Sequence, residues 1–150
     1  MKDISIPVKY GIEISIGLIV YFLICSLSGV YTNPIYSLFN SVIMGIGMYL
    51  ALKQYRFHSE GKFNYQKGFV TGLLTGFYAT VIFTIFFAIY STEIDPEFLN
   101  NLLPMWRGTY NTTSGMIFLA VAVMGFATTL VLTLTFMQLF KDSWNLQKRD

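Results

Sequence analysis

Long segments without a single charged residue constrain this chain more than any other feature. No Asp, Glu, Lys or Arg occurs in three segments, which span residues 14–52, 68–92 and 108–140. An α-helix needs about 20 apolar residues to cross the roughly 30 Å hydrocarbon core of a bilayer. The second and third segments therefore accommodate one transmembrane helix each, and the first is nearly long enough for two.

The overall composition excludes the common soluble classes. Charged residues make up 12% of the 150 residues, against about 25% in a typical soluble domain. The 10 Lys and Arg and 8 Asp and Glu are too evenly balanced for a nucleic-acid-binding surface. One cysteine excludes an internal disulfide framework and a multi-cysteine metal cluster. These features predict an integral membrane protein whose main partner is the lipid bilayer.

A turn divides the first segment into two spans. Proline disfavours helical geometry in the residue before it, so Asn33-Pro34 is a strong turn signal. We therefore expect an all-α integral membrane protein, a single domain over residues 1–150. Continuous apolar segments exclude a transmembrane barrel, which needs short alternating segments. The four transmembrane helices are predicted at about 12–30, 35–52, 69–90 and 115–140.

A cleaved signal peptide is the alternative for the first span. Ser26 and Ser28 are small residues at suitable positions for cleavage before Gly29. However, the segment before the apolar run is long and contains Asp3 and Glu13, and the run continues beyond Ser28. We therefore expect the first span to be retained.

The basic residues predict the orientation of the bundle. They gather in the N-terminal segment, the connection between spans two and three, and the C-terminal tail. These three segments lie on one side of the predicted bundle. Their basic residues are Lys2, Lys9, Lys53, Arg56, Lys62, Lys67, Lys141, Lys148 and Arg149. The third connection contains only Arg107, and the first turn contains no basic residue. Because short cytoplasmic loops are enriched in Lys and Arg, both termini are predicted to be cytoplasmic.

No residue pattern indicates catalysis, a metal or a cofactor. His58 is the only histidine and has no Cys or His partner at ligand spacing. Cys25 has no base beside it in the sequence, and we expect it to be a small buried side chain. No glycine-rich phosphate loop or hydrolase motif is present. The sequence therefore predicts a protein that is not an enzyme and holds no cofactor.

Polar residues within the predicted spans are candidates for a cavity. The ionisable one is Glu13, which can pair with Lys9 one turn earlier at the interface or take part in proton coupling. The neutral candidates are Tyr21, Asn40, Tyr78, Thr128 and Thr129. Such groups either bond a neighbouring helix or their own backbone, or they line a polar cavity for a substrate. One sequence does not decide between these roles.

Glycines spaced by four residues predict close helix packing. Gly68, Gly72 and Gly76 lie on one face of the third span, and Gly45 belongs to a similar pattern in the second. Small residues let two helix backbones approach closely in lipid. The face can pack within the bundle, or it can bind a second copy or another membrane protein.

The outer connection is predicted to contain a short amphipathic helix. Asp95, Pro96 and Glu97 fit an N-cap, a first-turn proline and a favourable first-turn acid. An apolar stripe at helical spacing follows, comprising Phe98, Leu99, Leu102, Leu103 and Trp106. We expect Pro104 to limit the helix to about two turns. It can lie on the outer leaflet, cover a cavity or bind a partner.

The order of these features resembles a known family. The residues that carry the resemblance are the starts of the first and third helices (9–11 and 61–65), the basic end of the second (53–56) and the outer segment 94–98. Together they resemble the membrane family of unknown function DUF4199, found mostly in Bacteroidetes-type bacteria. The resemblance implies a four-helix, multi-pass protein of the bacterial inner membrane. It implies no activity, ligand or catalytic residue.

The leading functional hypothesis is an accessory or assembly subunit that acts through helix packing. Its basis is the glycine face, the capped outer helix and the absence of charges deep in the spans. The alternative is a small transporter or channel subunit that forms a polar path by oligomerising. A membrane enzyme acting on lipid-like substrates is the weakest hypothesis, because no nucleophile and base or metal set is evident.

Overall fold

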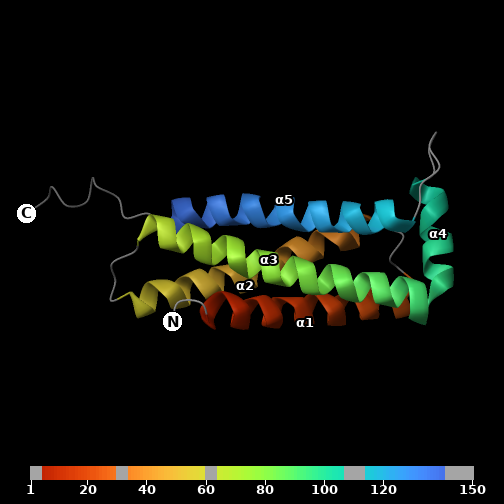
Figure 1. The fold of residues 1–150 in the computed structure, drawn as a ribbon, viewed down its shortest axis with the longest axis horizontal. Coiled ribbons are helices and arrows are strands. Elements are labelled where there is room, and N and C mark those ends of the chain that lie inside the picture. Colours follow the sequence, from red (N-terminus) through yellow and green to blue (C-terminus); the bar gives the residue numbers. More distant parts are fainter. Residues whose placement is uncertain (1–4, 30–33, 60–63, 107–113, 141–150) are drawn as a thin grey trace, which may run out of the picture.

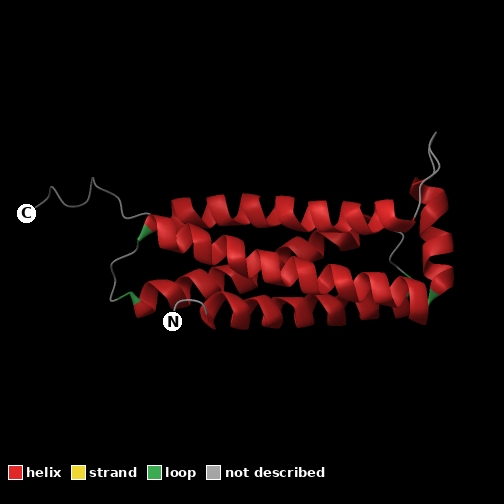
Figure 2. Ribbon diagram, viewed as in Figure 1, coloured by secondary structure: helices red, strands yellow, loops and turns green. Residues whose placement is uncertain are grey.

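The protein is an all-helical bundle over the residues that the structure describes. The computed structural model describes residues 5–29, 34–59, 64–106 and 114–140, and no strand occurs in these ranges (Figure 2). The helices are α1 (Ser5–Leu27), α2 (Pro34–His58), α3 (Tyr65–Ile89), the π-helical turn η3 (Tyr90–Ile94), α4 (Pro96–Trp106) and α5 (Ser114–Phe140).

Four long helices lie side by side, and the short α4 crosses one end of them (Figure 1). Helices α1 and α3 run in one direction, and α2 and α5 run in the other. The first residue of α1 and the last residue of α5 consequently lie at the same end of the bundle, opposite α4. Proline begins α2 at position 34, where the missing backbone N–H costs no helical hydrogen bond.

Three helices are long and apolar enough to cross a membrane, not the four that the sequence analysis predicted. They are α1, the continuous segment Tyr65–Ile94 and α5. Helix α2 has 25 residues but does not meet the same test. Asn40 and Ser41 interrupt its apolar part, and Lys53 and Arg56 lie in its last turns. By length and apolar character, the structure therefore supports three of the four predicted spans.

The bundle is apolar outside and partly polar inside. Large apolar side chains are exposed on all four long helices, as in Ile16, Ile46, Ile85 and Val131. The buried polar residues are Ser15, Thr71, Thr75, Thr80, Ser91, Thr129 and Thr133. Water would penalise this distribution, whereas lipid tails solvate the outer surface at no cost. The arrangement is therefore that of a membrane-embedded helical protein.

Along the interface between α3 and α5, glycines of one helix pack against threonines of the other. A Cβ atom at Gly72 would lie 2.9 Å from Thr133 Cγ2, and one at Gly76 would overlap Thr129. In the next pair the glycine is on α5 and the threonine on α3: a Cβ atom at Gly125 would overlap Thr80. The pairs advance four residues at a time in opposite directions along the two helices. This interlocking brings the two backbones close together, which strengthens van der Waals packing in lipid.

The other helix contacts depend more closely on Gly11 and Gly47 than on Gly45. In α1, Gly11 lies against Tyr78 and the backbone of Thr75 on α3. In α2, Gly47 receives the side chain of Ile14, whereas a Cβ atom at Gly45 would make only ordinary contact, at 3.6 Å from Leu132 Cδ2. The spacing of glycines alone did not reveal which of them meet a neighbouring helix.

A π-helical turn connects α3 to α4. Asp95 Oδ1 accepts a hydrogen bond from the backbone N–H of Phe98 at 3.1 Å, so Asp95 caps α4 as expected. Phe98 and Leu99 are buried against the end of the bundle. Helix α4 extends to Trp106, beyond the predicted limit at Pro104. The buried anchors at its start hold the helix in place, which offsets the loss of one backbone donor at the proline.

Candidate functional site

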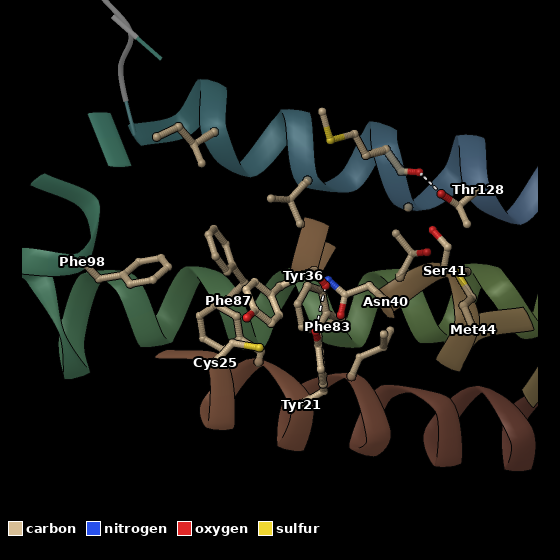
Figure 3. A pocket seen from close by; sticks show the side chains of 17 residues that line it. Tyr21, Cys25, Tyr36, Asn40, Ser41, Met44, Phe83, Phe87, Phe98 and Thr128 are labelled. Carbon is tan, nitrogen blue, oxygen red and sulfur yellow. Dashed lines mark hydrogen bonds between the residues drawn. The ribbon is translucent and has the colours of Figure 1, made fainter. Parts of the chain in front are cut away.

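A cavity of about 280 Å³ lies inside the bundle, in the part next to α4 (Figure 3). This volume is near the lower end of about 300–1,000 Å³ for small-molecule pockets. The lining comes from α1, α2, α3, α4 and α5, and none of the described lining residues is charged. They are Leu18, Tyr21, Phe22, Cys25, Tyr36, Asn40, Ser41, Met44, Thr80, Phe83, Phe87, Phe98, Ile117, Val121, Met124, Gly125 and Thr128.

The cavity occupies the half of the bundle nearer to α4. In the half away from α4, helices α2 and α5 touch, with Tyr49 stacked on Phe140 at 5.5 Å between ring centroids. Nearer to α4, their facing residues line the cavity instead. The most exposed lining residues are Tyr36 and Ser41 on α2 and Met124 on α5, which is 58% exposed. The cavity therefore opens sideways, between α2 and α5, onto the apolar outer surface.

Aromatic rings close the end of the cavity next to α4. Phe22 is at their centre and makes edge-to-face contacts with rings of α3 and α4. Its centroid lies 5.5 Å from that of Phe87 and 5.5 Å from that of Phe98. Aromatic pairs at these distances and tilts are worth about 0.5–1.5 kcal/mol beyond the area they bury. Helix α4 is therefore fixed over the cavity by packing of Phe98, and the end of the site is apolar.

The polar groups of the cavity lie farther from α4. Two of them are satisfied within the protein: Tyr21 donates to the carbonyl of Tyr36 at 2.9 Å, and Thr128 donates to the carbonyl of Met124 at 2.9 Å. Two others are buried without a hydrogen-bond partner, namely Oδ1 of Asn40 and Oγ1 of Thr80. In Figure 3, Asn40 lies between α5 and α1, within the space that the lining side chains surround. Both unpartnered atoms belong to residues of the cavity wall.

The structure brings together three of the six polar residues that the sequence analysis proposed for a cavity. Tyr21, Asn40 and Thr128 line it. Tyr78 lies against Gly11 at the contact between α3 and α1, and Thr129 is buried against Gly76. These two residues serve helix packing instead.

Glu13, the only ionisable candidate, lies outside the cavity. Its carboxylate is 3.9 Å from Lys9 Nζ, and both side chains are more than half exposed. Interfacial pairing was one of the two roles considered for it, and the geometry fits that role. No residue of the described cavity wall offers a second acid or base with which Glu13 could form a proton path.

Thr80 was missed as a cavity residue. Its position continues the line of Gly68, Gly72 and Gly76, so its spacing suggested only a packing face. The residue does pack against Gly125, yet it also lines the cavity, and its buried hydroxyl lacks a partner. Most other threonines of α3 and α5 donate to the carbonyl four residues earlier, as Thr75 does at 2.7 Å. Only the tertiary structure distinguishes Thr80 from them.

A second pocket lies at the opposite end of the bundle. Tyr10 donates to Gln54 Oε1 at 2.8 Å, which joins the start of α1 to the end of α2. Lys9 and His58 border this pocket, and Nδ1 of His58 lies 3.1 Å from the carbonyl oxygen of Gln54. Among the residues that the structure describes, no three His, Cys, Asp or Glu side chains are grouped to hold a metal ion.

Comparison with known proteins gives one match. The model of a family described as "protein of unknown function (DUF4199)" matches residues 9–141, and this range includes all four long helices except the first residues of α1. No curated protein and no solved structure matches the chain.

Proposed function

The chain belongs to the DUF4199 family, and we propose that it is a non-enzymatic, multi-pass membrane protein that binds a small, largely apolar molecule. The main support for this proposal is the uncharged cavity, which opens between α2 and α5 onto the apolar outer surface. A molecule dissolved in the bilayer can reach such a site without passing through water. The function is that of a binding or transport subunit.

We also propose that α2 crosses the membrane with the other three long helices. Helices α1 and α3 run in the same direction. If both cross, the chain between them must return across the bilayer, and α2 is the helix in that position. Its outward face is apolar over several turns, with exposed side chains at Ile35, Leu38, Phe39, Val42, Ile46 and Leu50. Both termini then lie on one side, which the positive-inside rule assigns to the cytoplasm of a bacterial inner membrane.

Labelling of single cysteines tests this topology. In a Cys25→Ser background, Ser28→Cys marks the end of α1 and Ser59→Cys the residue after α2. With a membrane-impermeant maleimide on intact bacterial cells, we expect Ser28→Cys to react and Ser59→Cys to react only after permeabilisation. Reaction of both positions from the same side would show that α2 does not cross.

The accessory-subunit hypothesis loses one of its three bases. Gly72 and Gly76 are buried against α5 of the same chain, so this glycine face is not open to a partner. The transporter alternative gains support, because three of the polar residues on which it depended surround one cavity. We therefore favour ligand binding within the bundle over assembly through the glycine face.

Binding of 1-methoxynaphthalene provides the direct test. Equilibrium dialysis would measure its uptake by the protein in lipid nanodiscs, above its partition into protein-free nanodiscs. We expect saturable binding at one site per chain. Met124→Trp, at the mouth of the cavity, should weaken this binding at least about tenfold, since the indole would fill the opening.

The neighbouring residue supplies a matched control. Val123 is 56% exposed, close to the 58% of Met124, but it does not line the cavity. Val123→Trp should therefore bind the probe as the wild type does. Absence of saturable binding in the wild type, or equal binding by Met124→Trp, would refute the proposed function.

A further inference from the structure

The unpartnered atoms of the cavity specify the chemistry of its ligand. We propose that the cavity binds a neutral, ring-bearing molecule that donates a hydrogen bond from a hydroxyl or amine group to Asn40 Oδ1, with the Thr80 hydroxyl as a second partner. This inference rests on the proposed function and identifies the class of ligand for the same site.

Two polar atoms in residues of the cavity wall lower the stability of the empty protein. A buried polar atom without a partner is destabilising, and native proteins leave few of them. Asn40 Oδ1 accepts no hydrogen bond, and Thr80, which is only 4% exposed, has an equally unpartnered hydroxyl. Lipid tails entering the cavity would not satisfy either atom. A ligand with a donor group would satisfy the amide oxygen, and the Thr80 hydroxyl can donate to or accept from the same polar group.

The aromatic wall and the volume of the cavity restrict the shape of the ligand. The apolar end of the cavity is bounded by the rings of Phe22, Phe83, Phe87 and Phe98. Aromatic walls favour planar rings, which they contact edge-to-face or in offset stacks. The volume of about 280 Å³ restricts the ligand to a small molecule. The ring would lie toward α4, with its polar substituent toward Asn40 and Thr80.

The neutral cavity wall disfavours a charged ligand. All described residues of the cavity wall are neutral. An ion transferred from water into such a site would lose its hydration without gaining an opposite charge. Anionic lipid headgroups, amino acids and metal ions therefore do not fit this cavity.

A pair of probes that differ in one donor group tests the inference. 1-Naphthol has a hydroxyl donor, whereas 1-methoxynaphthalene has the same ring system without a donor. In the nanodisc dialysis experiment, we expect the wild type to bind 1-naphthol about tenfold more tightly, the value of about one additional buried hydrogen bond. In Asn40→Leu, which keeps the size of the side chain, the preference should disappear because 1-naphthol binding weakens. Thr80→Val should reduce the preference partly.

Thr84 supplies a matched control. Its hydroxyl is also buried without a partner, but Thr84 does not line the cavity. Thr84→Val should therefore keep the full preference for 1-naphthol. Equal binding of the two probes by the wild type would overturn the inference but leave the proposed function intact. Retention of the preference in both Asn40→Leu and Thr80→Val would also overturn it, whereas failure of both probes to bind would refute the proposed function itself.

Discussion

Helix α5 has two very different neighbours in this bundle. Toward α3 it forms a closed interface, in which Gly72 and Gly76 receive Thr133 and Thr129. Toward α2 it makes ring contacts in the half of the bundle away from α4, and nearer to α4 residues of both helices line a cavity that opens to the outer surface. Both faces of α5 carry threonines, so composition does not explain the difference. The partner explains it: the glycines of α3 lie directly against threonines of α5, whereas Gly45 of α2 leaves only ordinary contact with Leu132, and Asn40 and Ser41 line the cavity.

The comparison suggests a division of roles. The α3–α5 interface contributes van der Waals contacts, which must stabilise the bundle because burial of apolar surface drives no association in lipid. The cavity on the α2–α5 side has two unsatisfied polar atoms in its wall, on Asn40 of α2 and on Thr80 of α3, and Thr133 within the α3–α5 interface has another. Residues that reduce stability in the empty protein are expected where a ligand binds. Substitutions on the two sides should therefore change stability in opposite directions.

The largest effect should come from closing the space at Gly76. A Cβ atom there would overlap Thr129, whose branched side chain has little freedom in a helix. Gly76→Ala should lower the free energy of unfolding by about 2–3 kcal/mol, a typical cost of overpacking. Unfolding in mixed micelles with increasing denaturing detergent would measure it.

Gly45 gives the matched control for this prediction. A Cβ atom at Gly45 would lie 3.6 Å from Leu132 Cδ2, which is ordinary contact. Gly45→Ala should change the free energy of unfolding by no more than about 0.5 kcal/mol, and the higher helix propensity of alanine can raise it. Equal losses at the two positions would contradict the distinction between the closed and the open side.

An intermediate effect of opposite sign is expected at Asn40. Asn40→Leu removes a buried acceptor that has no partner, so the ligand-free protein should gain up to about 1 kcal/mol of stability. The same unfolding measurement, on protein purified without added ligand, would detect the gain. A loss of more than about 1 kcal/mol would show that the amide serves the fold rather than a ligand.

The smallest effect is expected at the ion pair of Lys9 and Glu13. The two charged groups are 3.9 Å apart and more than half exposed, so solvent screens their attraction. Glu13→Gln should lower the free energy of unfolding by less than about 0.5 kcal/mol and leave probe binding unchanged. Any pH dependence of probe binding that disappeared in Glu13→Gln would instead support the proton-coupling role considered for this residue.

Much of the architecture was predictable from local sequence. The uncharged segments predicted long helices, and Asp95 and Pro96 predicted the start of the short helix between α3 and α5, because capping and hydropathy depend on nearby residues. Three of the four predicted spans are long and apolar enough to cross a membrane. The 35–52 segment lacks charge, yet Asn40 and Ser41 reduce its apolarity, and these polar residues face the cavity.

The candidate site was only partly predictable. Tyr21, Asn40 and Thr128 stood out as polar residues in apolar segments, but so did Tyr78 and Thr129, which pack against glycines. Helical periodicity places residues on a face of their own helix and does not show what that face meets. The cavity end formed by Phe22 and Phe98 depends on residues 76 positions apart in the chain, and no local pattern connects them.

The sequence by itself determined the membrane-embedded, all-helical character of this protein, because hydropathy and backbone hydrogen bonding in lipid act on each segment separately. It also determined the small-residue faces that allow helices to approach. Only the tertiary structure decided which glycines meet which threonines, and which residues line the cavity. These outcomes depend on how four helices share one interior, because the neighbours of a residue there come from segments far away in the sequence.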